Sequence, residues 1–193
     1  GTNWWIVWAV ANLARSMRIS PAGAVLDPGG VELPITITGT ANSIYNPVLV
    51  GAPTGGTMFL WHDMRAAAGG DANAYALPLT SANAPGVERC VSTGTANQRT
   101  SDVSEGPAGA SALVFVSEAS NDDRVLLHLL NPAAVPINPE PIEVFRGPTV
   151  GRASVAWNGS VYMVAWDSGA SGLTPTQVMA RRLAPDGTFI DPA

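Results

Sequence analysis

Residues 18–28 read Arg-Ile-Ser-Pro-Ala-Gly-Ala-Val-Leu-Asp-Pro, and residues 182–192 read Arg-Leu-Ala-Pro-Asp-Gly-Thr-Phe-Ile-Asp-Pro. The two stretches align without a gap, with Arg, Pro, Gly, Asp and Pro at identical spacing and apolar residues at corresponding positions. Agreement at so many positions indicates an internal repeat, and the period of a repeat points to the fold. Each stretch also contains a Pro-x-Gly turn, in which Gly can adopt positive φ and close a hairpin.

An apolar strand precedes each copy of this stretch, and two weaker strands of the same kind lie between them. The four strands are residues 4–8, 57–61, 112–116 and 161–166, which end at Trp8, Trp61, Val116 and Trp166. Successive strand ends lie 53, 55 and 50 residues apart. A period of about 40 to 50 residues is typical of propeller blades, each made of four strands.

The sequence therefore predicts an all-β protein, a β-propeller built from about four four-stranded antiparallel blades. We expect one repeat array over residues 1–193, with copies at about 1–41, 42–96, 97–147 and 148–193. The repeated positions that we expect to hold the blades together are Trp8, Trp61, Trp166, Gly23, Gly187, Asp27 and Asp191.

The two terminal blades are predicted to be incomplete. The first copy begins directly on its second strand, and the last lacks most of its outermost strand. Open sheet edges carry unpaired N–H and C=O groups that recruit other strands. We therefore expect this chain to be part of a longer protein or assembly, with other protein chains in contact with the terminal blades.

The composition describes a chain that can bury a large core. Hydrophobic residues make up 46% and charged residues 13% of the 193 residues, against roughly 25% charged residues in an average domain. The net charge is −5 and all ten basic residues are Arg, so the basic stripe typical of nucleic-acid binding is missing. Cys90 is the only cysteine, which excludes an intrachain disulfide, and we expect it to be buried. No apolar run reaches the ~20 residues of a membrane helix.

Residues 61–65, Trp-His-Asp-Met-Arg, resemble the W-x-D-x-R strand ending of propeller-forming repeat proteins secreted by bacteria, which is followed by a turn of the type R-I-S-P-x-G-x-x-L-D. The resemblance covers nearly the whole chain at the level of the repeat. The last copy keeps Trp166 and Asp167 without the Arg, and the first and third copies lack both charged residues. The resemblance implies a secreted or cell-surface protein of a bacterium, and it implies no reaction.

Polar residues gather where the second strand of each blade passes to the third. Variable loops on a rigid scaffold are where binding usually takes place, so we expect these residues to line a ligand-binding face: Asp63, Arg65, Asp71, Asp122, Asp123 and Asp167. Asp63 and Arg65 could instead form an ion pair that braces their blade. Residues 121–123, Asn-Asp-Asp, could bind Ca²⁺ through oxygen ligands, although a solvated turn explains them more simply. No other metal or cofactor is expected.

The sequence contains no recognisable catalytic set, and we assign no catalytic residue. His62 and His128 are the only histidines, and we interpret both as structural. His62 cannot face Asp63, because adjacent residues of a strand point to opposite faces. No G-x-S-x-G nucleophile elbow, H-E-x-x-H motif or phosphate-binding loop is present.

Three functional classes remain open, and the sequence favours a non-enzymatic one. The first is an extracellular binding or scaffold module whose variable loops contact a protein or a glycan. The second is a carbohydrate-active enzyme, which needs paired carboxylates roughly 5 to 9.5 Å apart, or a lectin on the same face. The third is a structural subunit of a multi-chain surface assembly. Trp4 and Trp5 are adjacent, so one of them faces away from the other and is a candidate contact for a sugar or a partner.

Overall fold

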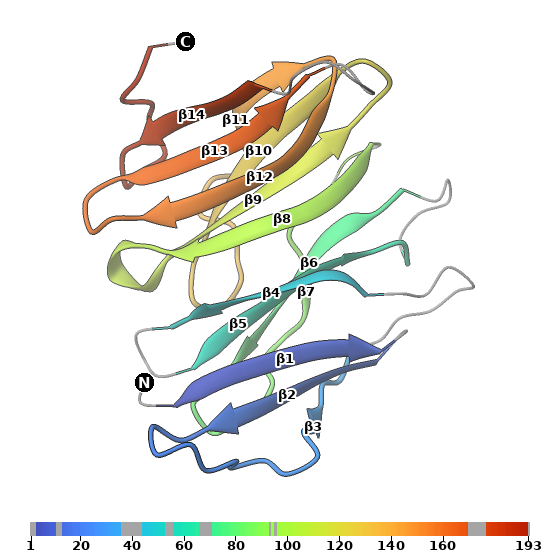
Figure 1. Ribbon diagram of the computed structural model, residues 1–193, viewed down its shortest axis with the longest axis vertical. Coiled ribbons are helices and arrows are strands. Elements are labelled where there is room, and N and C mark those ends of the chain that lie inside the picture. Colours follow the sequence, from blue (N-terminus) through green and yellow to red (C-terminus); the bar gives the residue numbers. More distant parts are fainter. Residues whose placement is uncertain are drawn as a thin grey trace.

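The computed structural model describes residues 3–10, 13–35, 44–52, 56–65, 71–92, 94, 96–169 and 177–192. Over these residues the chain consists of β-strands and one 3-10 turn, Pro107–Gly109. The strands form four antiparallel sheets of three or four strands, which follow one another in chain order along the length of the molecule (Figure 1). The predicted all-β class is confirmed. No described helix is long and apolar enough to cross a membrane.

Each sheet is a series of antiparallel hairpins that pair in chain order. The first sheet contains β1 (Trp4–Val10), β2 (Leu13–Ile19) and β3 (Val31–Glu32). The second contains β4 (Tyr45–Gly51), β5 (Thr57–Asp63), β6 (Asn73–Leu79) and β7 (Arg89–Cys90). The third contains β8 (Asn97–Glu105), β9 (Ser111–Glu118), β10 (Asp123–Leu130) and β11 (Ile142–Gly147). The fourth contains β12 (Val150–Trp157), β13 (Tyr162–Ser168) and β14 (Gln177–Leu183).

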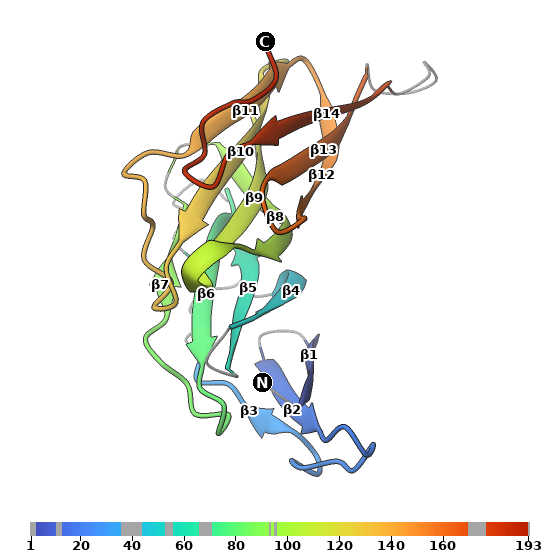
Figure 2. The same cartoon turned by 90° about the vertical axis from the view of Figure 1, so that its left-hand side faces the viewer.

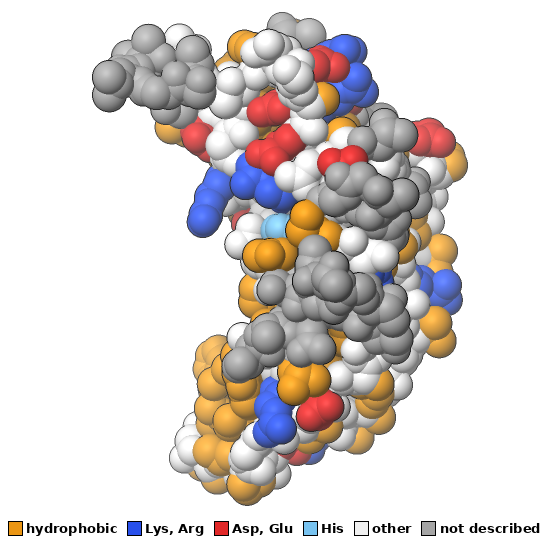
Figure 3. Space-filling model, turned by 90° about the vertical axis from the view of Figure 1, so that its right-hand side faces the viewer, with side chains coloured by type: hydrophobic (Ala, Val, Ile, Leu, Met, Phe, Trp, Pro, Cys, Tyr) orange, Lys and Arg blue, Asp and Glu red, His pale blue; other side chains and the backbone are white. Residues whose placement is uncertain are grey.

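The first strands of the second, third and fourth sheets lie on one side of the molecule, and we call β4, β8 and β12 the inner strands. The outer strands β7 and β11 lie on the opposite side (Figure 2). The molecule is a crescent, and its hollow is on the side of the inner strands (Figure 3). The described sheets form an arc of this kind and do not close into a ring.

The same turn follows one strand of each sheet, namely β2, β6, β10 and β14. The residue after the strand donates its N–H to the carbonyl four residues later, in turns that begin at Ser20, Thr80, Asn131 and Ala184. The fourth residue of each turn has a positive φ of 60° to 87°, at Gly23, Asn83, Ala134 and Gly187. Only Gly adopts this conformation without strain, and Asn tolerates it. The middle copies carry Asn and Ala there, so the sequence alone does not show the turn in them.

A carboxylate clamps the turn in the first and last sheets. Asp27 accepts hydrogen bonds from the backbone N–H of Arg18 at 3.0 Å and from its guanidinium at 2.9 Å. Asp191 makes the same contacts with Arg182. In the third sheet the side chain of Asn138 takes the corresponding place and accepts a bond from the backbone of the strand. The repeated Arg and Asp therefore have a structural explanation.

Neighbouring sheets pack face to face, and the two faces of a sheet differ. Phe59 and Trp61 of β5 pack towards the first sheet, whereas Met58 and Leu60 pack towards the third. The corresponding positions of β9 and β13 follow the same rule. In the middle strands of the second and third sheets, the aromatic residues thus face the preceding sheet and the smaller aliphatic residues face the following one.

Strand pairing corrects the sequence alignment at two positions. Trp61 pairs with its neighbour strand in the same way as Trp8 and Trp166 do, and in the third sheet the equivalent residue is Phe115. The alignment through Val116 is therefore wrong by one residue, because the sequence contains no Trp there to mark the position. By the same pairing Asp167 is equivalent to His62 and not to Asp63.

Cys90 is exposed, so the prediction that it is buried is wrong. It lies in β7, a strand of two residues at the outer edge of the second sheet. An edge strand has a neighbour on one side only, and this leaves the thiol accessible.

Two sheet faces have no neighbouring sheet among the described residues. On the first sheet, Trp4 and Ile6 are 70% and 44% exposed, and hydrophobic side chains gather over this end of the molecule (Figure 3). On the fourth sheet, Met163 and Val178 are 49% and 82% exposed. Of the two adjacent tryptophans, Trp5 packs against the second sheet, so Trp4 is the one that faces away.

We predict that the open face of the first sheet drives self-association of this chain, because contiguous apolar patches on a soluble protein mediate contacts. The double substitution Trp4→Ser and Ile6→Ser should lower the average mass measured by light scattering towards that of the monomer. The control is Val87→Ser, which removes an equally exposed apolar side chain from a loop. An unchanged association of the double variant would contradict the prediction.

Candidate functional site

The three inner strands are interrupted by β-bulges at nearly the same level. The regular pairing shifts between positions 45 and 48 of β4, 100 and 102 of β8, and 150 and 153 of β12. The residues inserted at these points are Asn46, Pro47, Ser101, Gly151 and Arg152. Bulges bend a strand and re-aim its side chains, and they occur often beside active sites. A further bulge lies elsewhere, between β10 and β11.

The bulged residues come together around one cavity. All five line a space of 320 Å³, together with Val48 and Arg99. An adjoining space of 360 Å³ shares Asn46, Arg99 and Arg152 with the first and adds Tyr45, His62, Met64, Ala72 and Asn97. We call the two spaces together the inner groove. Basic side chains and a histidine are visible in the hollow of the crescent (Figure 3).

Tyr45 and Arg99 occupy equivalent places on neighbouring inner strands. Tyr45 pairs with His62, and Arg99 pairs with Val116, which is the equivalent of His62 in the third sheet. Arg152 lies opposite Asp167, the equivalent residue of the fourth sheet, within the bulge of β12. One register position of the fold therefore supplies an aromatic ring and two guanidinium groups to the groove.

Arg99 is held in place by a neighbouring carboxylate. Its guanidinium forms an ion pair with Glu118, whose other oxygen accepts a hydrogen bond of 2.7 Å from the side chain of Asn97. The Nε of Arg99 is buried without a hydrogen-bond partner among the described residues. Glu118 itself lines neither space. Arg99 is thus oriented from one side and retains a donor on the other.

His62 is a buried and uncharged member of the groove. Its side chain is 5% exposed, and its ring stacks on that of Tyr45 at 5.4 Å between centroids. Burial lowers the pKa of His62 to about 4, and the positive charge of Arg99 contributes in the same direction. Its Nδ1 has no hydrogen-bond partner among the described residues. As expected, His62 and Asp63 do not face each other, because Asp63 bonds to Trp61 and Arg65 instead.

Gly151 allows a carboxylate to approach the backbone of β12. A Cβ atom at this position would collide with the carboxylate of Asp167, which also accepts a hydrogen bond from the backbone N–H of Arg152. Asp167 is a residue of the predicted binding face whose carboxylate accepts the hydrogen bond from the backbone N–H of Arg152, a residue that lines the groove. Asp167 itself lies outside the lining of both spaces.

Asp63 and Arg65 form an internal brace within the second sheet. The carboxylate of Asp63 is fully buried and accepts hydrogen bonds from the indole of Trp61 at 2.7 Å and from the guanidinium of Arg65 at 2.6 Å. The guanidinium carbon of Arg65 also lies 4.2 Å from the ring centroid of Tyr75. The same guanidinium group forms an ion pair with Glu88. These contacts correspond to the alternative interpretation of the W-x-D-x-R stretch, and neither residue lines the inner groove.

The remaining predicted residues are dispersed over the same end of the sheets. Asp123 is buried and accepts hydrogen bonds from the backbone N–H groups of Ala119 and Val150 at 3.1 and 2.9 Å. Asp122 is held by Arg146, and the hydrogen bonds from its arginine neighbours keep the pKa of this carboxyl below its ordinary value. Asp71 is half-buried just before β6.

Metal binding stays a prediction. Within the described part of the chain, no three His, Cys, Asp or Glu side chains come together as metal ligands. The Asn-Asp-Asp stretch contributes Asp122 and Asp123, and both carboxylates already have the protein partners described above. The side chains of Asp122 and Asp123 and their spacing do not indicate a preference for Ca²⁺.

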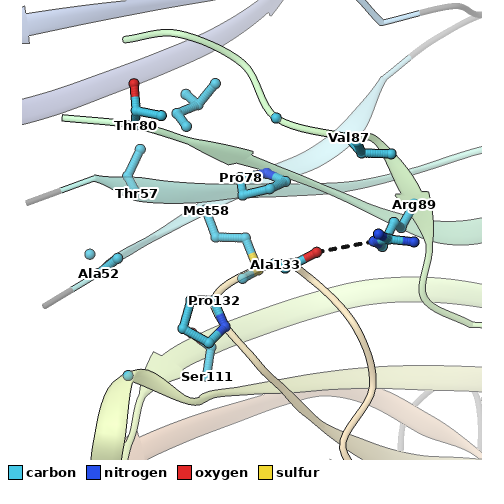
Figure 4. A pocket seen from close by; sticks show the side chains of 14 residues that line it. Ala52, Thr57, Met58, Pro78, Thr80, Val87, Arg89, Ser111, Pro132 and Ala133 are labelled. Atoms are coloured by element: carbon cyan, nitrogen blue, oxygen red, sulfur yellow. Dashed lines mark hydrogen bonds between the residues drawn. The ribbon is translucent and has the colours of Figure 1, made fainter. Parts of the chain in front are cut away.

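Two other cavities offer less chemistry. One, of 330 Å³, lies between the second and third sheets near the repeated turns (Figure 4). Its lining is mainly apolar, and its guanidinium group, that of Arg89, is bonded to the carbonyl of Ala133 at 3.1 Å. The other, of 420 Å³, contains Asp122, Glu140 and Glu143 on the outer part of the third sheet. The carboxylates at 122 and 143 pair with Arg124.

The sequence analysis did not select the residues of the inner groove. Tyr45, Asn46, Arg99, Ser101 and Arg152 belong to inner strands, whose inserted residues have no signature at the level of the repeat. The available signal was the polar run at 97–102, Asn-Gln-Arg-Thr-Ser-Asp, which is unusual for a strand. Its position in an inner strand follows only from the observed pairing.

Comparison with known proteins identifies the fold. No protein-family model matches the chain, and no curated protein matches its sequence. An endo-arabinase from Bacteroides thetaiotaomicron superposes with a TM-score of 0.63 at 10% identity, covering 95% of this chain and 71% of the enzyme. A GH43 β-1,3-galactosidase gives 0.60 at 11% identity, over 94% of this chain and 41% of its own length. An exo-1,5-α-L-arabinanase from a bovine ruminal metagenomic library gives 0.57 at 12% identity, covering 99% and 75%. These similarities show a β-propeller-like fold.

We predict that His62 makes the stability of the protein fall in mild acid. An unfolded His has a pKa of about 6.5, against about 4 in the folded chain. The unfolded chain therefore takes up a proton that the folded chain does not, and stability decreases as the pH falls from 6.5 towards 4. Between pH 7 and pH 5 this loss is about 2 kcal/mol.

Urea unfolding at the two pH values provides the measurement, with His62→Gln as the test variant. Burial also lowers the pKa of His128, so His128→Gln serves as the control for the second histidine. The drop in stability should be smaller in His62→Gln than in the wild type. An equal drop in the stability of the wild type and of His62→Gln would show that the fold does not hold His62 neutral.

Proposed function

We propose that this chain binds a carbohydrate in the inner groove and acts as part of a carbohydrate-active β-propeller. The observation that carries the proposal is the set of bulges in three consecutive inner strands. They direct an amide, a hydroxyl and a guanidinium group into one cavity, which is a small number of polar groups set in a concave site.

The chemistry of the groove suits a sugar. Tyr45 is 43% exposed, and an aromatic ring provides a flat apolar surface with a polar tip. Asn46, Arg99 and Ser101 supply hydrogen-bond donors and acceptors for the hydroxyl groups of a sugar, and His62 adds an uncharged ring nitrogen. The two spaces of 320 and 360 Å³ fall within the usual range for small-molecule sites.

The structural neighbours support the same class. They are an endo-arabinase, a β-1,3-galactosidase and an exo-1,5-α-L-arabinanase, which all act on carbohydrates. Binding of polysaccharides outside the cell fits the secreted or cell-surface setting that we expect from the sequence. We further propose that the open sheet faces contact additional sheets, either of a longer chain or of other chains, and that these sheets set the number of blades.

Glycoside hydrolysis is the second candidate function. Glu118 and Asp167 are two carboxylates in contact with residues that line the groove. Each of them is occupied, however, since Glu118 pairs with Arg99 and Asp167 binds the N–H of Arg152. A hydrolase needs one carboxyl group to protonate the leaving oxygen and another to act as base or nucleophile. The contacts therefore favour binding.

We expect Tyr45→Ala to lower the affinity of the chain for its oligosaccharide about tenfold, because the substitution removes the aromatic platform of the groove. A screen of arabinan and galactan oligosaccharides by isothermal titration calorimetry identifies the ligand, and the variant is then compared on it. Trp4→Ser is the matched control, since it removes an exposed aromatic ring from the open face. Loss of binding in the control and not in Tyr45→Ala would place the site on the open face.

We expect no release of reducing sugar from arabinan or β-1,3-galactan by the isolated chain. Glu118 and Asp167 both bind protein groups beside the groove, and these contacts favour binding over hydrolysis. A reducing-end assay with the wild type, Glu118→Gln and Asp167→Asn measures this directly. Turnover in the wild type that falls at least a hundredfold in either variant would establish the hydrolase instead.

A further inference from the structure

The inner groove is basic in a chain that is acidic overall. The net charge of the chain is −5, yet Arg99 and Arg152 line both spaces of the groove, and the described lining of neither space includes Asp or Glu. The carboxylates of Glu118 and Asp167 bind to residues of this lining without being part of it. A local concentration of one charge against the sign of the whole chain is a feature of selective sites for charged ligands.

Arg152 is a free cation within the described part of the chain. Its backbone N–H bonds to Asp167, but its guanidinium has no ion pair or hydrogen bond to a described residue. The side chain is exposed and belongs to the bulge of β12. The exposed arginines Arg146 and Arg182 form ion pairs, whereas the guanidinium of Arg152 at the common wall of two cavities is available to a ligand.

Arg99 complements Arg152 from the neighbouring inner strand. Glu118 fixes one side of its guanidinium, and its buried Nε lacks a partner. A guanidinium carries several N–H donors in a planar fork, so this ion pair leaves donors for a second acceptor. Two planar cations that share the lining of a cavity favour an anion with two oxygens.

The remaining lining residues suit the uncharged part of a sugar. Tyr45 and the stacked ring of His62 provide an apolar wall, and Nδ1 of His62 is a buried group without a partner among the described residues. His62 is nine-tenths buried and lines the groove. It is thus placed to exchange a hydrogen bond with a hydroxyl group of the ligand.

From this arrangement we infer that the inner groove selects an acidic carbohydrate, an oligosaccharide with uronate residues, and holds its carboxylate between Arg99 and Arg152. The inference rests on the proposed function and names its ligand class. A carboxylate is planar and matches the guanidinium fork with two parallel hydrogen bonds. Its ring hydroxyls contact Asn46, Ser101 and His62, and one face of the ring lies on Tyr45.

The test compares an oligogalacturonide with its carboxyl-reduced form, which has the same rings and linkages without the charge. Calorimetry at pH 7 should give a dissociation constant at least tenfold lower for the oligogalacturonide. Arg152→Ala should abolish this preference, because it weakens the binding of the oligogalacturonide more than that of the reduced form. Arg152→Lys keeps the charge without the fork, so its preference should be intermediate. Arg89→Ala, which removes an exposed arginine of the outer strand β7, should behave as the wild type.

Each outcome decides one point, and matching thermal melts of the variants show that they are folded. Equal binding of the charged and reduced forms overturns the uronate assignment and leaves carbohydrate binding intact. Tighter binding of a sulfated oligosaccharide of the same length assigns the groove to sulfate and overturns the carboxylate. Binding of no saccharide at all, across these probes and neutral arabinan and galactan oligosaccharides, overturns the proposed function itself.

Discussion

The packing of one sheet face on the next is the constraint on which the rest of the molecule depends. The second and third sheets are covered on both faces, and every residue of β5 is buried. A strand that is buried on both faces is continuously apolar and does not alternate. The residues of β5 and β9 that face the preceding sheet differ from those that face the following sheet, so the two faces of these sheets are not interchangeable.

This stacking leaves each inner strand as an edge whose backbone groups need partners. Side chains of the adjacent inner strand supply them, since Asp102 accepts a bond from the N–H of Val155 at 3.1 Å and Ser104 accepts one from the N–H of Trp157 at 3.0 Å. These two bonds account for the polar residues Asp102 and Ser104 in the inner strand β8. The polar groups of the groove lie among residues that the fold already requires.

The physical origin of each signal explains how much the sequence could predict. Strands and their hairpins depend on local residues, so the all-β class and the order of the strands could be predicted from the sequence. The turns of the middle sheets were not, because Asn83 and Ala134 occupy a conformation that the sequence marks only when it contains Gly. The brace of Asp63 and Arg65 has a local motif, and it was visible as such. The groove combines residues from 45 to 152 through bulges, whose positions depend on pairing between strands and on contacts between sheets.

The copies of the repeat agree where they serve the fold and differ where they surround the groove. All four turns use the same hydrogen bonds, and the tryptophan position of every sheet holds a large aromatic residue. The next position along these strands holds His62 in β5, Val116 in β9 and Asp167 in β13. The inner strands that pair with β5 and β9 place Tyr45 and Arg99 opposite this position. A lectin with one site in each blade would need the same side chains in each copy. The divergence instead indicates one composite site, to which each inner strand contributes a different chemical group.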